Sequence, residues 1–146
     1  MAELGHVVFY VHNVARSVAF YRDVVGLTLV GEIFGGRAAM LSGGRTHHEL
    51  LLIEVGDAPG NPPGRRVGLY HVGWKLGNSL DVLRATRERL QAHGVPIDGA
   101  SDHTVSQSLY VRDPDGNEIE LYVDDPSVDW KTSTAWMETP VKPLQL

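Results

Sequence analysis

The sequence predicts an α+β fold built from two tandem modules, each made of a strand, a helix and three further strands. Three observations predict it. The stretch HVVFYVHN (6–13) matches HVGWKLGN (71–78) at its histidine, valine, aromatic and asparagine positions, with a constant offset of 65 residues. A helical period follows each stretch, and shorter strand-like runs follow each helical period. Self-similarity of this kind indicates a duplicated structural unit.

The first module begins with the β-branched and aromatic residues of 6–13, which are typical of a strand. A helix is expected next, because apolar residues recur at helical spacing at Val14, Val18, Tyr21 and Val25. Asn13 is a suitable N-cap for this helix, and Gly26 a suitable stop. Three strand-like runs complete the module: LTLVGEIF, RAAMLSG and HHELLLIEV.

The second module repeats this order. The strand of 71–78 precedes a helical period marked by Leu80, Leu83, Arg87 and Leu90. Asn78 or Ser79 can cap its beginning, and Gly94 can end it. The strand-like runs that follow are SQSLYVRD and NEIELYV.

Module boundaries follow from composition. We expect one domain over residues 1–125, with module 1 at about 4–56, a linker at 57–66 and module 2 at about 67–125. The linker lies in GDAPGNPPGRR, which is rich in proline and glycine. Residues 126–146 have no clear period and are expected to form a C-terminal arm. This arm carries two tryptophans and is a candidate contact in a homodimer or higher homo-oligomer, because tryptophan is enriched at interfaces.

Composition excludes several classes of protein. The 146 residues are 42% hydrophobic and 21% charged, which is ordinary for one globular domain. A net charge of −5 argues against nucleic-acid binding. No apolar run approaches the roughly 20 residues that span a bilayer, and no signal segment is present, so a cytoplasmic protein without membrane contact is expected. Because cysteine is absent, any metal must be held by imidazole and carboxylate, and seven histidines are available.

The tandem βαβββ pattern, the histidine that opens each half and the closing DPDGNEIELY together resemble the vicinal oxygen chelate superfamily, which includes glyoxalase I, extradiol dioxygenases, and fosfomycin and bleomycin resistance proteins. The resemblance covers residues 5–125. Three stretches are most similar to extradiol enzymes of the catechol 2,3-dioxygenase type: YHVGWKL, DHTVSQSLYVRDPDGNEIELY and THHELLLIEV. The resemblance implies a cup-shaped, eight-stranded mixed sheet around one divalent metal.

By this resemblance the metal ligands are His6, His71 and Glu120. Two imidazoles and one carboxylate leave coordination positions open, which suits Fe(II) with a bidentate substrate and dioxygen. Mn(II), Zn(II) and Ni(II) are alternative metals. Glu120 shares one strand face with Glu118 and Tyr122, amid apolar residues of the other face. A buried glutamate without a partner is unfavourable, so a ligand role explains its position.

Three further residues are candidate catalytic groups. Tyr110 precedes Glu120 by ten residues across the DPDGN turn, so hairpin pairing is expected to place the two nearly opposite each other. The resemblance implies that this tyrosine hydrogen-bonds a substrate oxygen. His48 and His103 can transfer protons, because imidazole titrates in the required range. His103 can equally be a solvent-exposed loop histidine.

Glu49 leaves the chemistry open, because in glyoxalase I-like proteins a glutamate of this strand is a fourth ligand. His48 and Glu49 point to opposite faces of one strand, so at most one of them faces the site. The function expected from the resemblance is ring cleavage of a catechol-like small molecule by O2, in the catabolism of aromatic compounds. The alternatives are a glyoxalase I-like lyase, isomerase or epimerase, and a metal-free drug-binding protein of the bleomycin-resistance kind.

Overall fold

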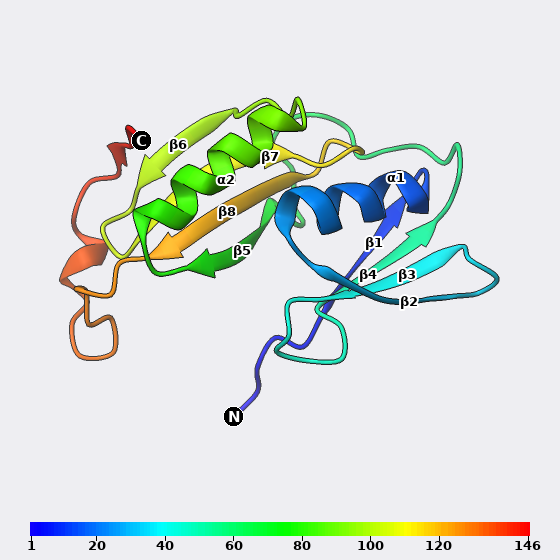
Figure 1. Cartoon of the computed structure of the whole chain (residues 1–146). Helices are drawn as coiled ribbons and strands as arrows, with labels where there is room; N and C mark the ends of the chain where they lie inside the picture. The colour runs from blue at the N-terminus through cyan, green and yellow to red at the C-terminus, as the bar shows by residue number, and fades with distance from the viewer. The chain divides into compact units, whose positions relative to one another are not determined.

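The computed structural model describes all residues from 1 to 146, and the chain divides into two compact units. Unit 1 comprises Met1–Val67 together with Asp113–Asp115, and unit 2 comprises Gly68–Arg112 and Gly116–Leu146. Each unit contains one mixed sheet and one α-helix (Figure 1). The α+β class and the two βαβββ modules predicted from the sequence are therefore confirmed. No helix in the chain is both long and apolar enough to cross a lipid bilayer.

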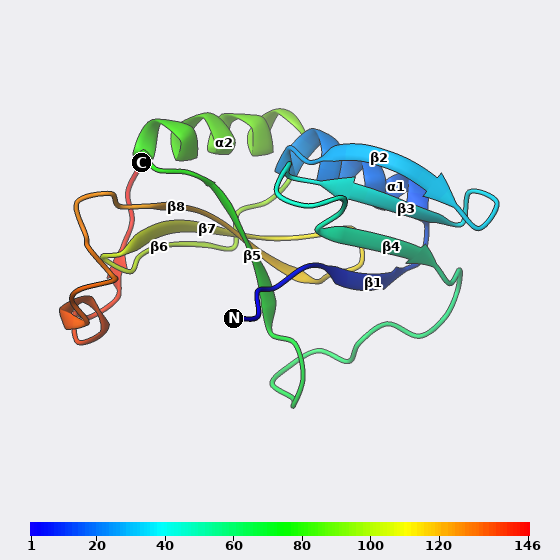
Figure 2. The ribbon, with the colours of Figure 1, turned by 90° about the horizontal axis from the view of Figure 1, so that it is seen from below.

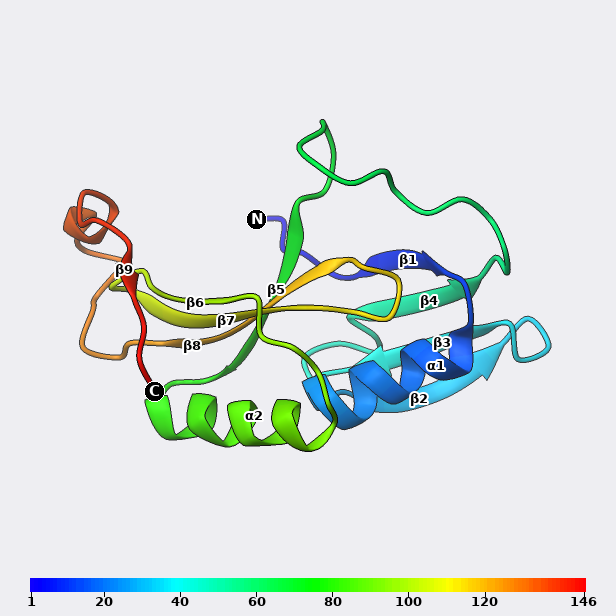
Figure 3. The ribbon, with the colours of Figure 1, turned by 90° about the horizontal axis from the view of Figure 1, so that it is seen from above.

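Unit 1 has a four-stranded sheet in the order β1-β4-β3-β2, in which β1 and β4 are parallel and the other neighbours are antiparallel. Its elements along the chain are β1 (Val7–Val11), α1 (Val14–Ala19), a π-helical segment (Phe20–Val25), β2 (Thr28–Ile33), β3 (Ala38–Ser42) and β4 (Leu50–Glu54). Figure 3 shows α1 on one side of this sheet. Leu50 and Leu52 of β4 are fully buried in the core, whereas Val8 and Tyr10 of β1 are exposed.

The predicted ends of the first helix are confirmed. The side chain of Asn13 accepts a hydrogen bond from the backbone N–H of Arg16 at 2.8 Å, which satisfies one of the unpaired donors at the helix start. Gly26 ends the π-helical segment in the left-handed conformation, with φ at 100°. Glycine adopts this conformation without the steric penalty of a side chain.

Two carboxylates of residues 113–115 are held within unit 1 by the helical segment. Asp113 is buried and accepts a 2.8 Å hydrogen bond from the hydroxyl of Tyr21, which is also fully buried. Asp115 accepts from Ser17 Oγ at 3.3 Å, and its Oδ1 lies 2.8 Å from His12 Nδ1. Burial, followed by the charge of Asp113, raises the pKa of Tyr21 well above its ordinary value. Tyr21 therefore remains a donor to Asp113 throughout the neutral range.

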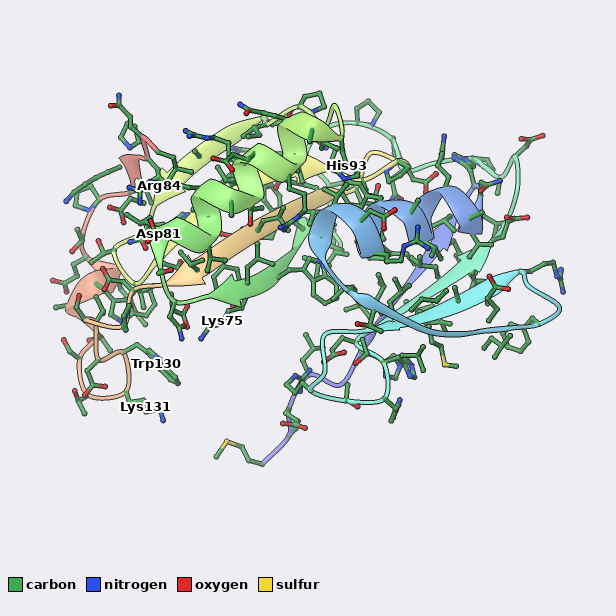
Figure 4. The ribbon with its side chains drawn as sticks, in the orientation of Figure 1. Lys75, Asp81, Arg84, His93, Trp130 and Lys131 are labelled. Atoms are coloured by element: carbon green, nitrogen blue, oxygen red, sulfur yellow. The ribbon has the colours of Figure 1, made fainter.

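Unit 2 has a five-stranded sheet in the order β5-β8-β7-β6-β9, with β5 and β8 parallel and the remaining neighbours antiparallel. Its elements are β5 (His71–Gly77), α2 (Leu80–Ala92), β6 (Gly99–Asp102), β7 (Ser106–Arg112), β8 (Glu118–Asp124), a 3₁₀ turn (Ala135–Met137) and β9 (Lys142–Pro143). Helix α2 covers one face of this sheet (Figure 2). The N-cap of α2 is Ser79, which makes no side-chain capping bond, and His93 lies at its C-terminal end (Figure 4).

Strand β8 divides its side chains between the two faces of the sheet as the sequence predicts. Ile119, Leu121 and Val123 are fully buried, in a unit whose helix also buries Leu83 and Leu90. The alternate residues of β8, which include Glu118 and Glu120, are only half-buried on the other face. The apolar face is therefore the core of unit 2, and the polar face is available for chemistry.

The C-terminal residues pack on unit 2. Lys142 and Pro143 pair with β6, and the backbone carbonyl of Leu146 accepts a 2.6 Å hydrogen bond from the Arg87 guanidinium. Further back, the Lys131 ammonium lies 5.6 Å from the centre of the exposed Trp130 ring (Figure 4). The sequence reasoning identified neither β6 nor β9. The division into one domain over 1–125 and an arm over 126–146 stays a prediction.

Candidate active site

The polar face of the unit 2 sheet gathers four of the predicted site residues. His71 opens β5, Tyr110 lies on β7, and Glu120 lies at the centre of β8. His103 follows β6 directly. Tyr110 and Glu120 are register partners in the β7–β8 ladder, as the ten-residue spacing predicts. Strand pairing alone thus brings together residues that lie up to 49 positions apart in the sequence.

The carboxylate of Glu120 is the centre of this group. Its Oε1 accepts hydrogen bonds from Ser108 Oγ at 2.6 Å and from the Tyr110 hydroxyl at 3.2 Å. Its Oε2 lies 3.1 Å from His71 Nε2. These partners explain how a carboxylate that is largely shielded from water is tolerated in this strand.

Tyr110 connects Glu120 to His103, because its hydroxyl oxygen also lies 2.7 Å from His103 Nε2. Burial, followed by the charge and the hydrogen bond of Glu120, raises the pKa of Tyr110 to about 12. The phenol therefore keeps its proton at neutral pH and acts as a hydrogen-bond donor. His103 is half-buried and has a partner, so it is not the freely exposed loop histidine of the alternative interpretation.

His71 has a carboxylate at each ring nitrogen. Nδ1 lies 3.1 Å from Glu118 Oε2, and Nε2 lies 3.1 Å from Glu120 Oε2. A carboxylate can only accept a hydrogen bond. Each of the two contacts is therefore attractive only if the ring nitrogen carries a proton or binds a cation. At Nδ1 the positive species is the ring proton; at Nε2 it is either a second proton or a metal cation.

Unit 1 holds the other two predicted residues, His6 and His48, next to each other. Their ring centroids are 4.8 Å apart, and His47 lies beside His48 with the two Nδ1 atoms at 2.6 Å. Burial, followed by repulsion from His47 and His6, lowers the pKa of His48 below its ordinary value of 6.5. His48 is therefore neutral at physiological pH and able to accept a proton.

The alternative ligand Glu49 has a structural use in unit 1. Its buried carboxylate accepts backbone N–H bonds from Gly43 at 2.8 Å, Arg45 at 3.0 Å and Thr46 at 3.2 Å. Burial acts to raise the pKa of Glu49, but these donors and Ser42 outweigh it, and the net pKa is lowered. Glu49 is thus the anion that closes the loop between β3 and β4.

The sequence pattern assigns no site role to three residues of the unit 2 group: Ser108, Glu118 and Gly73. Gly73 is the register partner of Glu120, and a Cβ built there would lie 3.3 Å from Glu120 Oε2. The glycine therefore leaves space for the carboxylate. A signal for Ser108 was available, because it lies two residues before Tyr110 and so shares its face.

The donor atoms of the unit 2 group are imidazole nitrogen and carboxylate oxygen, a set that suits divalent iron, manganese or zinc. Nowhere do three or more His, Asp or Glu side chains already surround one point. At His71 the two neighbouring carboxylates do not meet at one point, because Glu118 lies beside Nδ1 and Glu120 lies beside Nε2. His71 and Glu120 belong to unit 2, whereas His6 belongs to unit 1.

Relatives of this chain include dioxygenases. Catechol-2,3-dioxygenase of Bacillus subtilis (strain 168) is 34% identical over 128 residues, which are 88% of this chain and 44% of the relative. Manganese-dependent 2,3-dihydroxybiphenyl 1,2-dioxygenase of Geobacillus genomosp. 3 is 28% identical over 127 residues, which are 85% of this chain and 37% of the relative. The chain thus spans less than half the length of these two enzymes.

A solved structure extends the comparison to another chemistry. Lactoylglutathione lyase from Agrobacterium tumefaciens superimposes with a TM-score of 0.62 at 25% identity, over 84% of this chain and 94% of that one. Residues 3–121 match the Glyoxalase/Bleomycin resistance protein/Dioxygenase superfamily, which is most of the chain. The protein is therefore a member of that superfamily, and it is related to extradiol dioxygenases.

Proposed function

We propose that this protein is a metal-dependent extradiol dioxygenase that cleaves the ring of a catecholic substrate with O2. The observation that carries the proposal is the linked group of His71, Glu120, Tyr110 and His103 on one sheet face. The identity to catechol-2,3-dioxygenase supports the same chemistry. In this group His71 and Glu120 are the proposed metal ligands, and Tyr110 and His103 are the proposed hydrogen-bond donor and proton-transfer group.

In this proposal His71 and Glu120 are metal ligands, and His6 is the third ligand that the superfamily resemblance implies. The 3.1 Å separation of His71 Nε2 and Glu120 Oε2 supports it, because both atoms could then ligate one cation. Fe(II) is the proposed metal, with Mn(II) as the alternative that the name of one relative suggests; Zn(II) and Ni(II) belong to the lyase alternative. When bound, the metal would act as a template for substrate and O2 and as a sink for charge.

The remaining residues orient the substrate and move protons. The Tyr110 hydroxyl, which keeps its proton, donates a hydrogen bond to a substrate oxygen. His103 Nε2 lies 2.7 Å from that hydroxyl, so it orients the Tyr110 donor and is itself the proposed proton-transfer group beside it. His48, neutral and next to His6, is the proposed base that removes a catechol proton.

A glyoxalase I-like lyase or isomerase is the second candidate, because the lactoylglutathione lyase fold superimposes on this chain. That chemistry uses a fourth protein ligand, for which Glu49 is the sequence candidate. The three backbone donors that Glu49 satisfies within its own loop argue against this use. The metal-free drug-binding alternative leaves the polar group on the unit 2 sheet without a purpose.

The three candidates are separated by anaerobic reconstitution with Fe(II), followed by addition of 4-methylcatechol and air. Oxygen uptake with a yellow ring-opened product is the result expected for the dioxygenase. Turnover of a hemithioacetal with Ni(II) or Zn(II), independent of oxygen, would instead identify the lyase. Micromolar binding of an aromatic drug by the metal-free protein, with neither turnover, would identify the binding protein.

Substitutions test the proposed ligands individually. His6→Asn, His71→Asn and Glu120→Ala should each lower Fe(II) affinity by at least tenfold, because each removes one of three ligands. His93→Asn, at the exposed end of α2, is the matched histidine control and should bind Fe(II) as the wild type does (Figure 4). Unchanged affinity in the Glu120→Ala protein would refute the proposed metal site.

A further inference from the structure

Glu118 is a carboxylate that neither the sequence pattern nor the proposed reaction requires, yet it contacts a proposed metal ligand. It is the register partner of His71 on β5 and of Arg112 on β7, so the three side chains form one row across the sheet. Glu118 Oε2 lies 3.1 Å from His71 Nδ1. Only 15% of the Glu118 side chain and 27% of the His71 side chain are exposed, so water screens this contact poorly.

The other side of Glu118 faces Arg112, which is itself held from two directions. Arg112 Nη2 lies 3.9 Å from Glu118 Oε1. Arg112 Nε binds Asp98 Oδ2 at 3.1 Å, and its Nη1 donates to the carbonyl of Gly116 at 3.1 Å. Two acceptors thus orient the half-exposed guanidinium, which supplies a positive charge near the oxygen of Glu118 that His71 does not use.

When a metal occupies Nε2, as the proposed function requires, the one ring proton of His71 lies on Nδ1, beside Glu118. Glu118 can only accept a hydrogen bond, so Nδ1 donates to it, and the lone pair that a metal needs is then the one on Nε2. Nε2 is the nitrogen that faces Glu120 Oε2. Without Glu118 the ring could adopt the other tautomer or rotate, and both changes remove the lone pair from the side of Glu120.

We propose that Glu118 is a positioning residue that holds His71 with Nδ1 protonated and Nε2 directed at the metal, and that Arg112 steadies Glu118. This inference rests on the proposed function, because it needs His71 as a ligand. Hydrogen bonds from a ligating histidine to a carboxylate orient the ring and increase its basicity. A surface glutamate that only forms an ion pair would have neither effect on metal binding.

Zn(II) is a suitable probe, because it is diamagnetic and takes the same imidazole and carboxylate ligands. Its affinity is measured by competition with a chelating dye for the wild type and for Glu118→Ala, Glu118→Gln, Glu120→Ala and Glu88→Ala. We expect Glu118→Ala to bind Zn(II) about 10- to 100-fold more weakly than the wild type. Glu118→Gln should recover most of this loss, because its amide oxygen still accepts from Nδ1–H. Glu88 is exposed on α2, so Glu88→Ala should leave the affinity unchanged.

A second measurement reports the position of the proton. In the ¹⁵N NMR spectrum of the Zn(II)-loaded wild type, His71 should show a protonated, slowly exchanging Nδ1 and a metal-bound Nε2. The slowly exchanging Nδ1–H signal should persist in Glu118→Gln and disappear in Glu118→Ala. A residue that only stabilises the fold would not move this signal, and circular dichroism of each variant checks that the fold is kept.

The outcomes separate this inference from the proposed function. If Glu120→Ala loses Zn(II) while Glu118→Ala binds as the wild type does with its Nδ1–H signal intact, the role of Glu118 is refuted and the metal site stands. If the wild type binds no Zn(II), or Glu120→Ala binds it equally well, both proposals are overturned. If Glu118→Ala does not fold, Glu118→Leu replaces it in both measurements. A Zn(II) affinity and an Nδ1–H signal equal to those of the wild type would then refute the role of Glu118, and loss of both would support it.

Discussion

At the scale of single residues, the shielded carboxylates of this protein differ in the donors that stabilise them. Glu49 accepts mainly from backbone N–H groups, Asp113 from the Tyr21 phenol and the backbone N–H of Asp115, and Glu120 from the hydroxyls of Ser108 and Tyr110. The donor decides what the carboxylate can do. Backbone donors fix a loop permanently, whereas side-chain hydroxyl donors can rotate and leave oxygen atoms available to a ligand.

The Tyr21–Asp113 hydrogen bond makes a prediction about stability. The substitution Tyr21→Phe keeps the aromatic ring and removes only the hydroxyl that donates to the buried carboxylate of Asp113. We expect the free energy of unfolding to fall by about 1–3 kcal/mol, because Asp113 loses a donor in a place that water does not reach. Urea denaturation measures it. Tyr10→Phe is the control, since Tyr10 is exposed, and an equal change in both variants would contradict this account.

Glu49 makes a prediction about pH. Its folded-state pKa lies below the ordinary 4.5, so its ionised form contributes stability that is fully present above the unfolded pKa and is lost as the pH falls through the folded pKa. Glu49→Gln should therefore lower the free energy of unfolding by about 1–3 kcal/mol at pH 7. The gap between wild type and variant should narrow as the pH is lowered below about 4.5, as followed by urea titrations from pH 7 to 3. A gap that is constant over this range would show that the carboxylate charge is not involved.

At the scale of elements, the two helices differ in how they begin. The side chain of Asn13 accepts a hydrogen bond from a backbone N–H in the first turn of α1, whereas the side chain of Ser79 makes no capping bond to α2. Asn13→Ala should thus lower the free energy of unfolding by about 1 kcal/mol, while Ser79→Ala should change it by much less. Thermal or urea unfolding of the two variants measures the difference. Equal effects would mean that the capping bond contributes nothing to stability.

The hairpin of β7 and β8 is the element that sequence predicts best. A turn of fixed length determines the register of its two strands, so the pairing of Tyr110 with Glu120 follows from counting residues. Strand β6 was missed because its sequence, GASD, has no apolar alternation. Its conformation comes from pairing with β7 on one side and β9 on the other, which no local pattern encodes.

At the scale of the whole molecule, the C-terminal residues cover a sheet edge. In a chain that ends at Asp125, β6 would become an edge strand with unpaired backbone groups, which favours aggregation. We expect a decrease of about 1–3 kcal/mol in the free energy of unfolding, from the lost strand pairing and the lost Arg87 bond. A chain that ends at Pro140 lacks β9 but keeps the preceding turn, so it separates their contributions to stability. If the chain that ends at Asp125 is as stable as the full chain, the C-terminal residues do not stabilise the sheet.

The same truncated chains test the predicted homodimer, which stays a prediction. Sedimentation should show loss of assembly in the chain ending at Asp125 if the tryptophan-bearing residues form the contact, because exposed Trp130 would be removed. A chain ending at Pro140 retains Trp130 and should still assemble. Unchanged assembly of both chains would exclude the C-terminal residues as the contact.

The sequence by itself determined the order of the elements other than β6 and β9, the alternation of β8 and the pairing of Tyr110 with Glu120. These features depend on residues close together in the chain, where periodicity and turn length are sufficient. Only the tertiary structure decided that Glu49 closes a loop, that Glu118 contacts Nδ1 of His71 and that residues 142–143 extend the second sheet. Glu118 and His71 are 47 positions apart, and the paired residues of β6 and β9 are about 40 positions apart. The role of Glu49 depends on the direction of one side chain. Neither periodicity nor composition could therefore reveal these three features.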